Sequence, residues 1–92
     1  MIQKFKHKGL KQLFESGIAA GVKPEQVKRL RHILALLETA ETIKDMDLPA
    51  LKLHELKGKR KGTWSVSVSG NWRVTFNFEA EHATGVDYLD YH

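Results

Sequence analysis

The chain has 92 residues, enough for one domain with a modest hydrophobic core, so we expect residues 1–92 to form a single domain. It contains no cysteine, which excludes disulfides and thiolate metal sites, and 41% of its residues are hydrophobic, as in a folded protein. No apolar run is long enough to span a membrane, and the first residues lack a signal-peptide pattern, so we expect a cytoplasmic protein with no membrane partner.

The net charge of +4 is unevenly distributed along the chain. Lys and Arg concentrate in residues 1–30 and 52–73, whereas residues 74–92 contain acids but no Lys or Arg. The acidic end should therefore fold beside the basic segments. Blocks of positive charge favour a polyanionic partner through phosphate contacts and counterion release. A basic surface that is merely solvated explains the same charge equally well.

The first half of the sequence predicts a short strand followed by two helices. Residues 2–5 alternate between apolar and polar side chains, as a strand does. From Lys8 onwards, apolar residues at helical spacing predict a first helix with Gly17 as a stop signal. Pro24 fits the first position of a second helix, whose apolar stripe continues to about Ala40.

A β-hairpin is the clearest secondary-structure signal in the chain. Residues 64–69 and 72–78 both alternate between apolar and polar side chains. A three-residue loop, which pairs Val68 with Trp72, separates an apolar face from a polar face, whereas a two-residue turn mixes them. We therefore favour the three-residue loop. Residues 85–89 predict the last strand. The polar face of the hairpin would carry Ser65, Ser67, Arg73, Thr75 and Asn77.

The predicted element order is β-α-α-β-β-β, which defines an α+β fold. Two N-terminal helices should pack on one face of a small, mostly antiparallel sheet and leave the face of Arg73 open to solvent. Residues 57–62, a basic run with glycines at its second and last positions, should form a loop before the hairpin.

Several side chains that can move protons lie near the ends of the predicted strands. His54 precedes the basic loop, and Asp90, Tyr91 and His92 follow the last strand. RNA cleavage needs a group that deprotonates a 2′-OH, a group that protonates the leaving 5′ oxygen, and cations that stabilise the phosphorane. Histidine suits the first two roles because its pKa lies near neutrality. Taken singly, each of these residues is more often structural or simply exposed.

The sequence predicts no metal site and no cofactor. The five histidines include no pair at i and i+4, and no cysteine accompanies them, which argues against zinc. The glycines of the basic loop lack the strand and helix that flank a phosphate-binding loop, and the Lys-Ser/Thr ending is missing too.

The second half of the chain contains a set of short motifs: Leu53-His54-Glu55-Leu56-Lys57-Gly58, Arg60, Gly62, Trp64-Ser65, Asn71-Trp72-Arg73, Phe76 and Asp90-Tyr91-His92. In combination they resemble the HigB branch of the RelE/ParE toxin superfamily, and the resemblance covers the whole chain. It implies a RelE-like microbial RNase fold and a ribosome-dependent mRNA endonuclease of a type II toxin–antitoxin pair. Such a toxin cuts mRNA in the 30S A site and is held inactive by a HigA-type helix-turn-helix antitoxin.

The resemblance also assigns residues to the site. It implies that His54, Asp90, Tyr91 and His92 are catalytic, and that Lys57 and Arg73 contact phosphate. His92 or His54 would act as general base, with Asp90 orienting a histidine or acting as base itself, and Tyr91 would stabilise charge or donate a proton. The attack of the 2′-OH would be metal-independent acid–base chemistry.

One position of the basic loop departs from the family pattern. Lys59 stands where the family often has an acid, which makes the loop more basic and could alter contacts with the ribosome or the antitoxin. Arg60 is our own addition to the site: it supports the phosphate site or makes a structural ion pair.

Two other functions stay open from the sequence. A non-catalytic superfamily member, such as a ParE-like gyrase poison, does not need an acid–base cluster near the end of its last strand. A basic RNA-binding module would explain the charge blocks but leaves that cluster unexplained.

Overall fold

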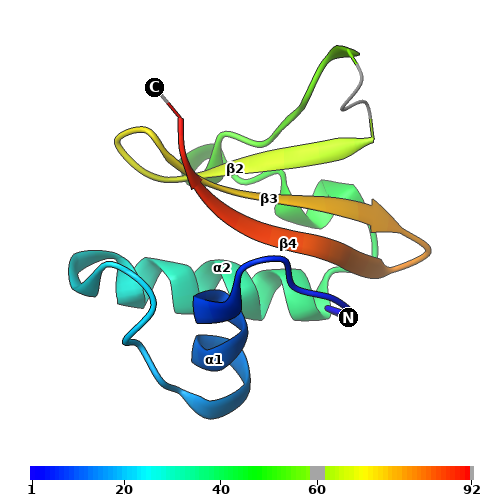
Figure 1. The fold of residues 1–92 in the computed structure, drawn as a ribbon. Coiled ribbons are helices and arrows are strands. Elements are labelled where there is room, and N and C mark those ends of the chain that lie inside the picture. The colour runs from blue at the N-terminus through cyan, green and yellow to red at the C-terminus, as the bar shows by residue number, and fades with distance from the viewer. Residues whose placement is uncertain (59–61, 92) are drawn as a thin grey trace.

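The protein forms two layers, with helices covering one face of a sheet (Figure 1). The computed structural model describes residues 1–58 and 62–91. Helices α1 (Lys8–Ser16) and α2 (Val27–Thr39) make the helical layer. The sheet has four antiparallel strands in the order β1-β2-β3-β4, and the α+β class is confirmed. Its strands are β1 (His54–Glu55), β2 (Thr63–Ser69), β3 (Trp72–Glu79) and β4 (His82–Asp90).

Both predicted helices are present, and their ends follow from local chemistry. The His7 side chain caps α1, because its Nδ1 accepts a hydrogen bond from the backbone N–H of Leu10 at 3.1 Å. Gly17 ends α1 with a positive φ of 72°. A 3-10 turn, Pro24–Gln26, leads into α2, and two further 3-10 turns, Ile43–Met46 and Pro49–Leu51, lead to β1. No helix in the described part of the chain is long and apolar enough to cross a bilayer.

Two glycines fix the connection between α1 and α2. A Cβ atom at Gly9 would lie 2.5 Å from the carbonyl oxygen of Gly21, and a Cβ atom at Gly21 would lie 2.6 Å from Cα of Gly9. The backbones therefore approach closely only because neither residue has a side chain. Val22, next along the loop, is buried in the core. This anchored loop ends at Lys23, beside the end of the sheet that carries Asp90.

The hairpin formed by β2 and β3 corrects one predicted detail. Val66 pairs with Val74 and Trp64 with Phe76, as predicted, but Ser69 pairs with Trp72, so the turn has two residues instead of three. An extra residue in β2, Val68, takes up the difference as a β-bulge. The bulge keeps Val68 in the core, at 3% exposure, which a regular ladder with a two-residue turn would not allow.

The polar face of the sheet is less open than predicted. Ser65 and Thr75 lie at its centre and are 0% and 2% exposed. Both are short side chains in the middle of one row of paired residues. His54 and Asp87 flank them in the same row of paired residues. Arg73 on this face is half-buried.

Strand β4 starts earlier than predicted and contains a second bulge. Thr75 pairs with Asp87 but Asn77 pairs with Thr84, so β4 has one extra residue between these pairs. Gly85 lies at this point with a φ of +60°, the left-handed conformation that the first residue of a G1 bulge adopts. The bulge decides which face each residue of β4 beyond it occupies.

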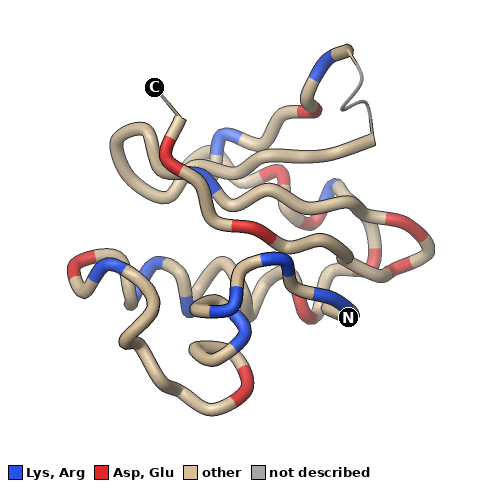
Figure 2. Tube along the Cα trace, viewed as in Figure 1, with Lys and Arg blue, Asp and Glu red and all other residues tan. Residues whose placement is uncertain are grey.

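The predicted first strand, residues 2–5, is not a regular strand. Ile2 and Phe5 make isolated parallel bridges to Ala83 and Val86 of β4. The segment thus runs beside β4 on its outer edge, and it carries lysines next to the acids of β4 (Figure 2). The expectation that the acidic end folds beside a basic segment is confirmed.

Candidate active site

Rows of paired residues across the sheet place the predicted site residues relative to one another. One row runs His54, Ser65, Thr75, Asp87 across all four strands. The next row runs Ser67, Arg73, Leu89 across β2, β3 and β4. Residues that pair across antiparallel strands project from the same face. All of these side chains therefore project from the face opposite the helices.

His54 lies on the shortest strand of the sheet. Its side chain is exposed, and its Nδ1 lies 3.3 Å from the carbonyl oxygen of Lys52. Beyond β1, the N–H of Leu56 donates to Thr63 O at 2.8 Å. The Glu55 carboxylate accepts a hydrogen bond from the N–H of Gly62 at 2.9 Å. These bonds close the base of the loop after β1 and hold His54 against the edge of β2.

Arg73 shares the face of His54 but lies two strands away. With strands about 4.8 Å apart and two residues of offset, their Cα atoms are separated by roughly 12 Å. Side chains that start from Cα atoms this far apart leave room for a phosphodiester between them. The imidazole and the guanidinium can therefore act on one substrate without touching each other.

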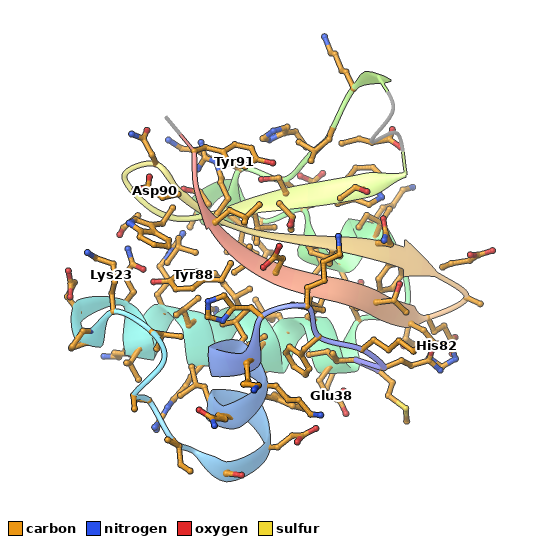
Figure 3. All side chains as sticks on the ribbon, in the orientation of Figure 1. Lys23, Glu38, His82, Tyr88, Asp90 and Tyr91 are labelled. Carbon is orange, nitrogen blue, oxygen red and sulfur yellow. The ribbon has the colours of Figure 1, made fainter. Side chains whose placement is uncertain are left out.

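Asp90 and Tyr91 lie at the same end of the sheet but on different faces (Figure 3). Asp90 pairs with Trp72, which places its side chain on the helix side of the sheet edge. Tyr91 follows by alternation on the face of Arg73, and its N–H donates to Asn71 O at 2.8 Å. The sequence placed Arg73 on the open face and Asp90 directly after the last strand, without assigning Asp90 a face. The structure places them at one end of the sheet, with their side chains on opposite faces.

Lys57 starts from the other end of the sheet. It is exposed and follows β1 in a loop that rises from the sheet on the side away from the helices (Figure 1). Its neighbour Leu56 bonds to Thr63 at the start of β2, whereas Arg73 pairs with Ser67 near the end of β2. The structure therefore does not bring the backbones of Lys57 and Arg73 together. The predicted site residues Arg60 and His92 lie outside the described residues.

A groove of about 540 Å³ lies on the helix side, beside Asp90. No sequence pattern suggested it, because the loop that forms one wall has no regular periodicity. Trp72 forms the back of the groove and packs on Tyr88, with ring centroids 4.6 Å apart. The ammonium of Lys23 lies 5.6 Å from the centroid of Trp72. The groove is lined by His7, Ala20, Gly21, Val22, Lys23, Pro24, Trp72, Tyr88, Leu89 and Asp90.

Tyr88 is a fixed wall of this groove. Its hydroxyl donates to Oε1 of Gln26, and Nε2 of Gln26 donates to Ser69 Oγ at 2.8 Å. Burial raises the pKa of the Tyr88 phenol, and the carboxylate of Glu25 raises it further, against a lowering hydrogen bond from the backbone of Lys23. Tyr88 therefore stays protonated at neutral pH and serves as a structural donor.

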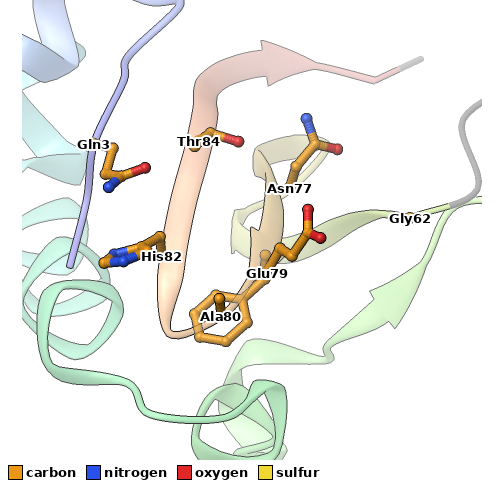
Figure 4. A pocket seen from close by; sticks show the side chains of 8 residues that line it. Gln3, Gly62, Asn77, Glu79, Ala80, His82 and Thr84 are labelled. Carbon is orange, nitrogen blue, oxygen red and sulfur yellow. The ribbon is translucent and has the colours of Figure 1, made fainter.

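A second hollow, of about 520 Å³, lies at the opposite end of the sheet near the β3–β4 turn (Figure 4). Its lining includes none of the predicted catalytic residues and no Lys or Arg. It is lined by Gln3, Gly62, Asn77, Phe78, Glu79, Ala80, His82 and Thr84. Within residues 1–58 and 62–91, no group of three or more His, Asp or Glu is placed to hold a metal ion.

The fold and the site define a class: a small basic α+β protein whose predicted acid–base residues lie at the edges of one sheet. A model of HigB-like toxins, described as the RelE-like toxin of type II toxin–antitoxin system HigB, matches residues 3–92. The chain is also 47% identical to Endoribonuclease HigB of Proteus vulgaris over 92 residues, covering 100% of both chains. The chain therefore belongs to the HigB-like, RelE-like family of type II toxins.

Proposed function

We propose that this toxin is an endoribonuclease that cleaves mRNA in the A site of the 30S subunit and so inhibits translation. One observation carries the proposal: His54 and Arg73 project from the same face, and Tyr91 closes that face at its end. The name of the Proteus vulgaris relative, Endoribonuclease HigB, supports the same activity. A face with an imidazole, a phenol and a guanidinium suits acid–base attack on a phosphodiester.

The reaction needs no group beyond the side chains of the site. His54 or His92 removes the proton of the 2′-OH, and Asp90 orients a histidine or acts as the base. The 2′ oxygen forms a bond to phosphorus while the bond from phosphorus to the 5′ oxygen breaks. Tyr91 or a protonated histidine gives a proton to that leaving oxygen. Arg73 stabilises the charge that develops on the phosphorane.

Basic side chains of the loop after β1 bind the RNA backbone in this proposal. Lys57 is exposed and free to reach a phosphate, and Arg60 adds to the same phosphate site. Because strand β2 lies between His54 in β1 and Arg73 in β3, the RNA must be held in line between them. The ribosome supplies that alignment, since positioning alone accounts for a large part of many rate accelerations.

The family supports a proposal for the partners and the compartment of this toxin. A toxin of a type II pair has an antitoxin, and we propose a HigA-type helix-turn-helix protein in that role. Ribosome-bound mRNA as the substrate places the toxin in the cytoplasm.

We predict that replacing His54 by Ala, or deleting Tyr91 and His92, lowers the cleavage rate at least roughly a hundredfold, the usual contribution of a general acid or base. The rate is measured on ribosomes programmed with a synthetic mRNA under single-turnover conditions. His32→Ala is the matched control, because His32 is an exposed histidine of α2 in the helical layer. It should cleave at the wild-type rate.

Two results would overturn the proposal. If the folded deletion variant cleaves at the wild-type rate, Tyr91 and His92 take no part in the reaction. Equal rates on free and ribosome-bound RNA would remove the ribosome requirement. Thermal unfolding of each variant shows whether a loss of activity is a loss of fold.

A further inference from the structure

The groove beside Asp90 has the chemistry of a nucleotide site. Its back wall is the ring of Trp72, which is half-buried and held from behind by Tyr88. The ammonium of Lys23 lies over that ring, 5.6 Å from its centroid, and the Lys23 side chain is 45% exposed. Aromatic rings stack on unpaired bases, and a nearby cation binds the phosphate, which is how proteins hold single-stranded RNA.

The walls of the groove are preorganised. Tyr88 is fixed by its hydrogen bond to Gln26, which is 3% exposed. The loop that carries Lys23 is held by the close backbone contact of Gly9 and Gly21. A volume of about 540 Å³ falls in the range of small-ligand sites, roughly 300–1,000 Å³. A bound nucleotide would therefore meet a rigid wall rather than one that must first be ordered.

The position of the groove links it to the proposed catalytic site. Asp90 lines the groove, while Tyr91 turns to the face of Arg73. An RNA strand that contacts both residues must cross the end of β4 from one face of the sheet to the other. The nucleotide next to the scissile bond then enters the groove.

We propose that this groove, bounded by Lys23, Trp72 and Asp90, binds one nucleotide of the mRNA adjacent to the scissile phosphate. The exposed Lys23 side chain moves from its place over the ring to bind the phosphate, and the ring of Trp72 then stacks against the base. Lys23 also pairs with Glu25 at 3.8 Å, a solvent-exposed contact that a phosphate can replace at little cost. The inference rests on the proposed endoribonuclease function and assigns a subsite to it.

Two lysines test the phosphate contact. We expect Lys23→Ala to lower kcat/KM for ribosome-bound mRNA by about fivefold, because one phosphate contact is lost. Lys23→Glu should lower kcat/KM further, because its carboxylate repels the phosphate. Lys28→Ala removes the same charge from an exposed position of α2 that does not line the groove, and it should stay within about twofold of wild type. Equal rates for Lys23→Ala and Lys28→Ala would overturn the phosphate contact.

An abasic nucleotide tests the base contact. Synthetic mRNAs carry one abasic nucleotide at successive positions on either side of the cleaved bond. At one position next to the cut, the abasic site should slow the wild type by about tenfold, as for the loss of one stacked base. Trp72→Leu should cleave intact mRNA slowly, and the abasic nucleotide at that position should not lower its cleavage rate further. If each abasic position lowers the cleavage rate of the wild type and of Trp72→Leu by the same factor, the stacking contact is overturned.

The outcomes separate this inference from the proposed function. If the Lys23 variants cleave like the wild type while His54→Ala is inactive, the groove assignment fails and the endonuclease stands. If the wild type does not cleave ribosome-bound mRNA, both fail. Trp72 packs on the core, so Trp72→Leu is assayed only if its unfolding is cooperative; the Lys23 variants decide the result without it.

Discussion

Tyr88 shows how one buried polar group holds the site end of the sheet together. Its ring contacts the rings of both Trp72 and His7, and its hydroxyl donates to the buried amide of Gln26. Gln26 in turn bonds to Ser69 at the end of β2. A single chain of contacts therefore connects the start of α2 with the ends of β2 and β4.

We predict that Tyr88→Phe destabilises the fold by about 1–2 kcal/mol at pH 7, because it leaves a buried amide oxygen without a donor. Urea unfolding followed by fluorescence measures the change. Gln12→Ala, on the exposed side of α1, provides a control within about 0.5 kcal/mol of wild type. A Tyr88→Phe protein as stable as wild type would show that the hydrogen bond contributes nothing net.

The raised pKa of Tyr88 also predicts a pH dependence. A phenol whose pKa is higher in the folded state than the unfolded value of 10 contributes its stability below pH 10. That contribution is lost as the pH rises from 10 through the folded pKa. The wild type should therefore lose stability over this alkaline window, and Tyr88→Phe should lack this component. Parallel stability profiles for the two proteins above pH 10 would contradict the assignment.

Single residues were the part of the site most accessible from sequence. An imidazole, a phenol and a guanidinium are recognisable by type, and the sequence predicted the open face for Arg73 alone. The structure adds His54 and Tyr91 to that face through the register of the sheet. The face of Asp90 was not predictable, because it depends on an extra residue in the middle of β4. One extra residue in a strand moves every later side chain of that strand to the other face of the sheet.

At the level of elements, the bulge at Gly85 sets the geometry of the site. Continuing the register of the β3–β4 turn without it would pair Arg73 with Tyr88 and place Asp90 on the same face. With the bulge, Arg73 pairs with Leu89, Tyr88 enters the core, and Asp90 moves to the helix side. One extra residue therefore distributes the proposed acid–base groups over both sides of the sheet edge.

We predict that Gly85→Ala and Gly70→Ala cost about the same stability, on the order of 1 kcal/mol each, but that only Gly85→Ala impairs cleavage. Both glycines have a positive φ, +60° and +55°, and neither site is sterically blocked. The strain at Gly85 acts on the strand that carries Asp90, whereas Gly70 lies in a turn. Unfolding free energies and cleavage rates of both variants test this. Equal cleavage rates of the two variants would show that the bulge at Gly85 does not determine the activity of the site.

The helices and the hairpin were predictable because periodicity and capping act locally. The short strand β1 was missed, since two residues give no pattern. The two-residue turn was rejected because, without a bulge, it mixes the faces of the hairpin. The bulge at Val68 keeps the apolar and polar faces separate despite the two-residue turn, and no local sequence pattern predicts this bulge.

At the scale of the whole molecule, the N-terminal segment closes the outer edge of the sheet. Its backbone bonds to β4 through Gln3 and Lys6, and the N–H of Ile2 donates to the carboxylate of Glu38 in α2 at 2.7 Å. The segment therefore contacts both layers. Its sheet partner was not predictable from sequence, since residues 2–5 carry no signal for which distant strand they join.

We predict that Glu38→Ala loosens this segment while the rest of the fold persists. Losing the carboxylate leaves the N–H of Ile2 without its acceptor, at a cost of about 1 kcal/mol. Hydrogen exchange should accelerate at Gln3, Ala83 and Val86 relative to amides of the β2–β3 ladder. Glu41→Ala, an exposed acid just beyond α2, is the control. Uniform acceleration over all strands would indicate global destabilisation instead.

The contact of the N-terminal segment with β4 also fixes an order of events during synthesis. The segment is made first, yet its hydrogen bonds go to the strand that is made last among the described elements, and the Met1 ammonium donates to Glu81 O over a separation of 80 residues. A contact between residues so distant along the chain has to overcome a large loop-closure entropy. The residues of both helices are therefore synthesised before those of the strand that this segment joins. The ribosome that makes the toxin has almost finished translating the domain before a complete toxin can exist.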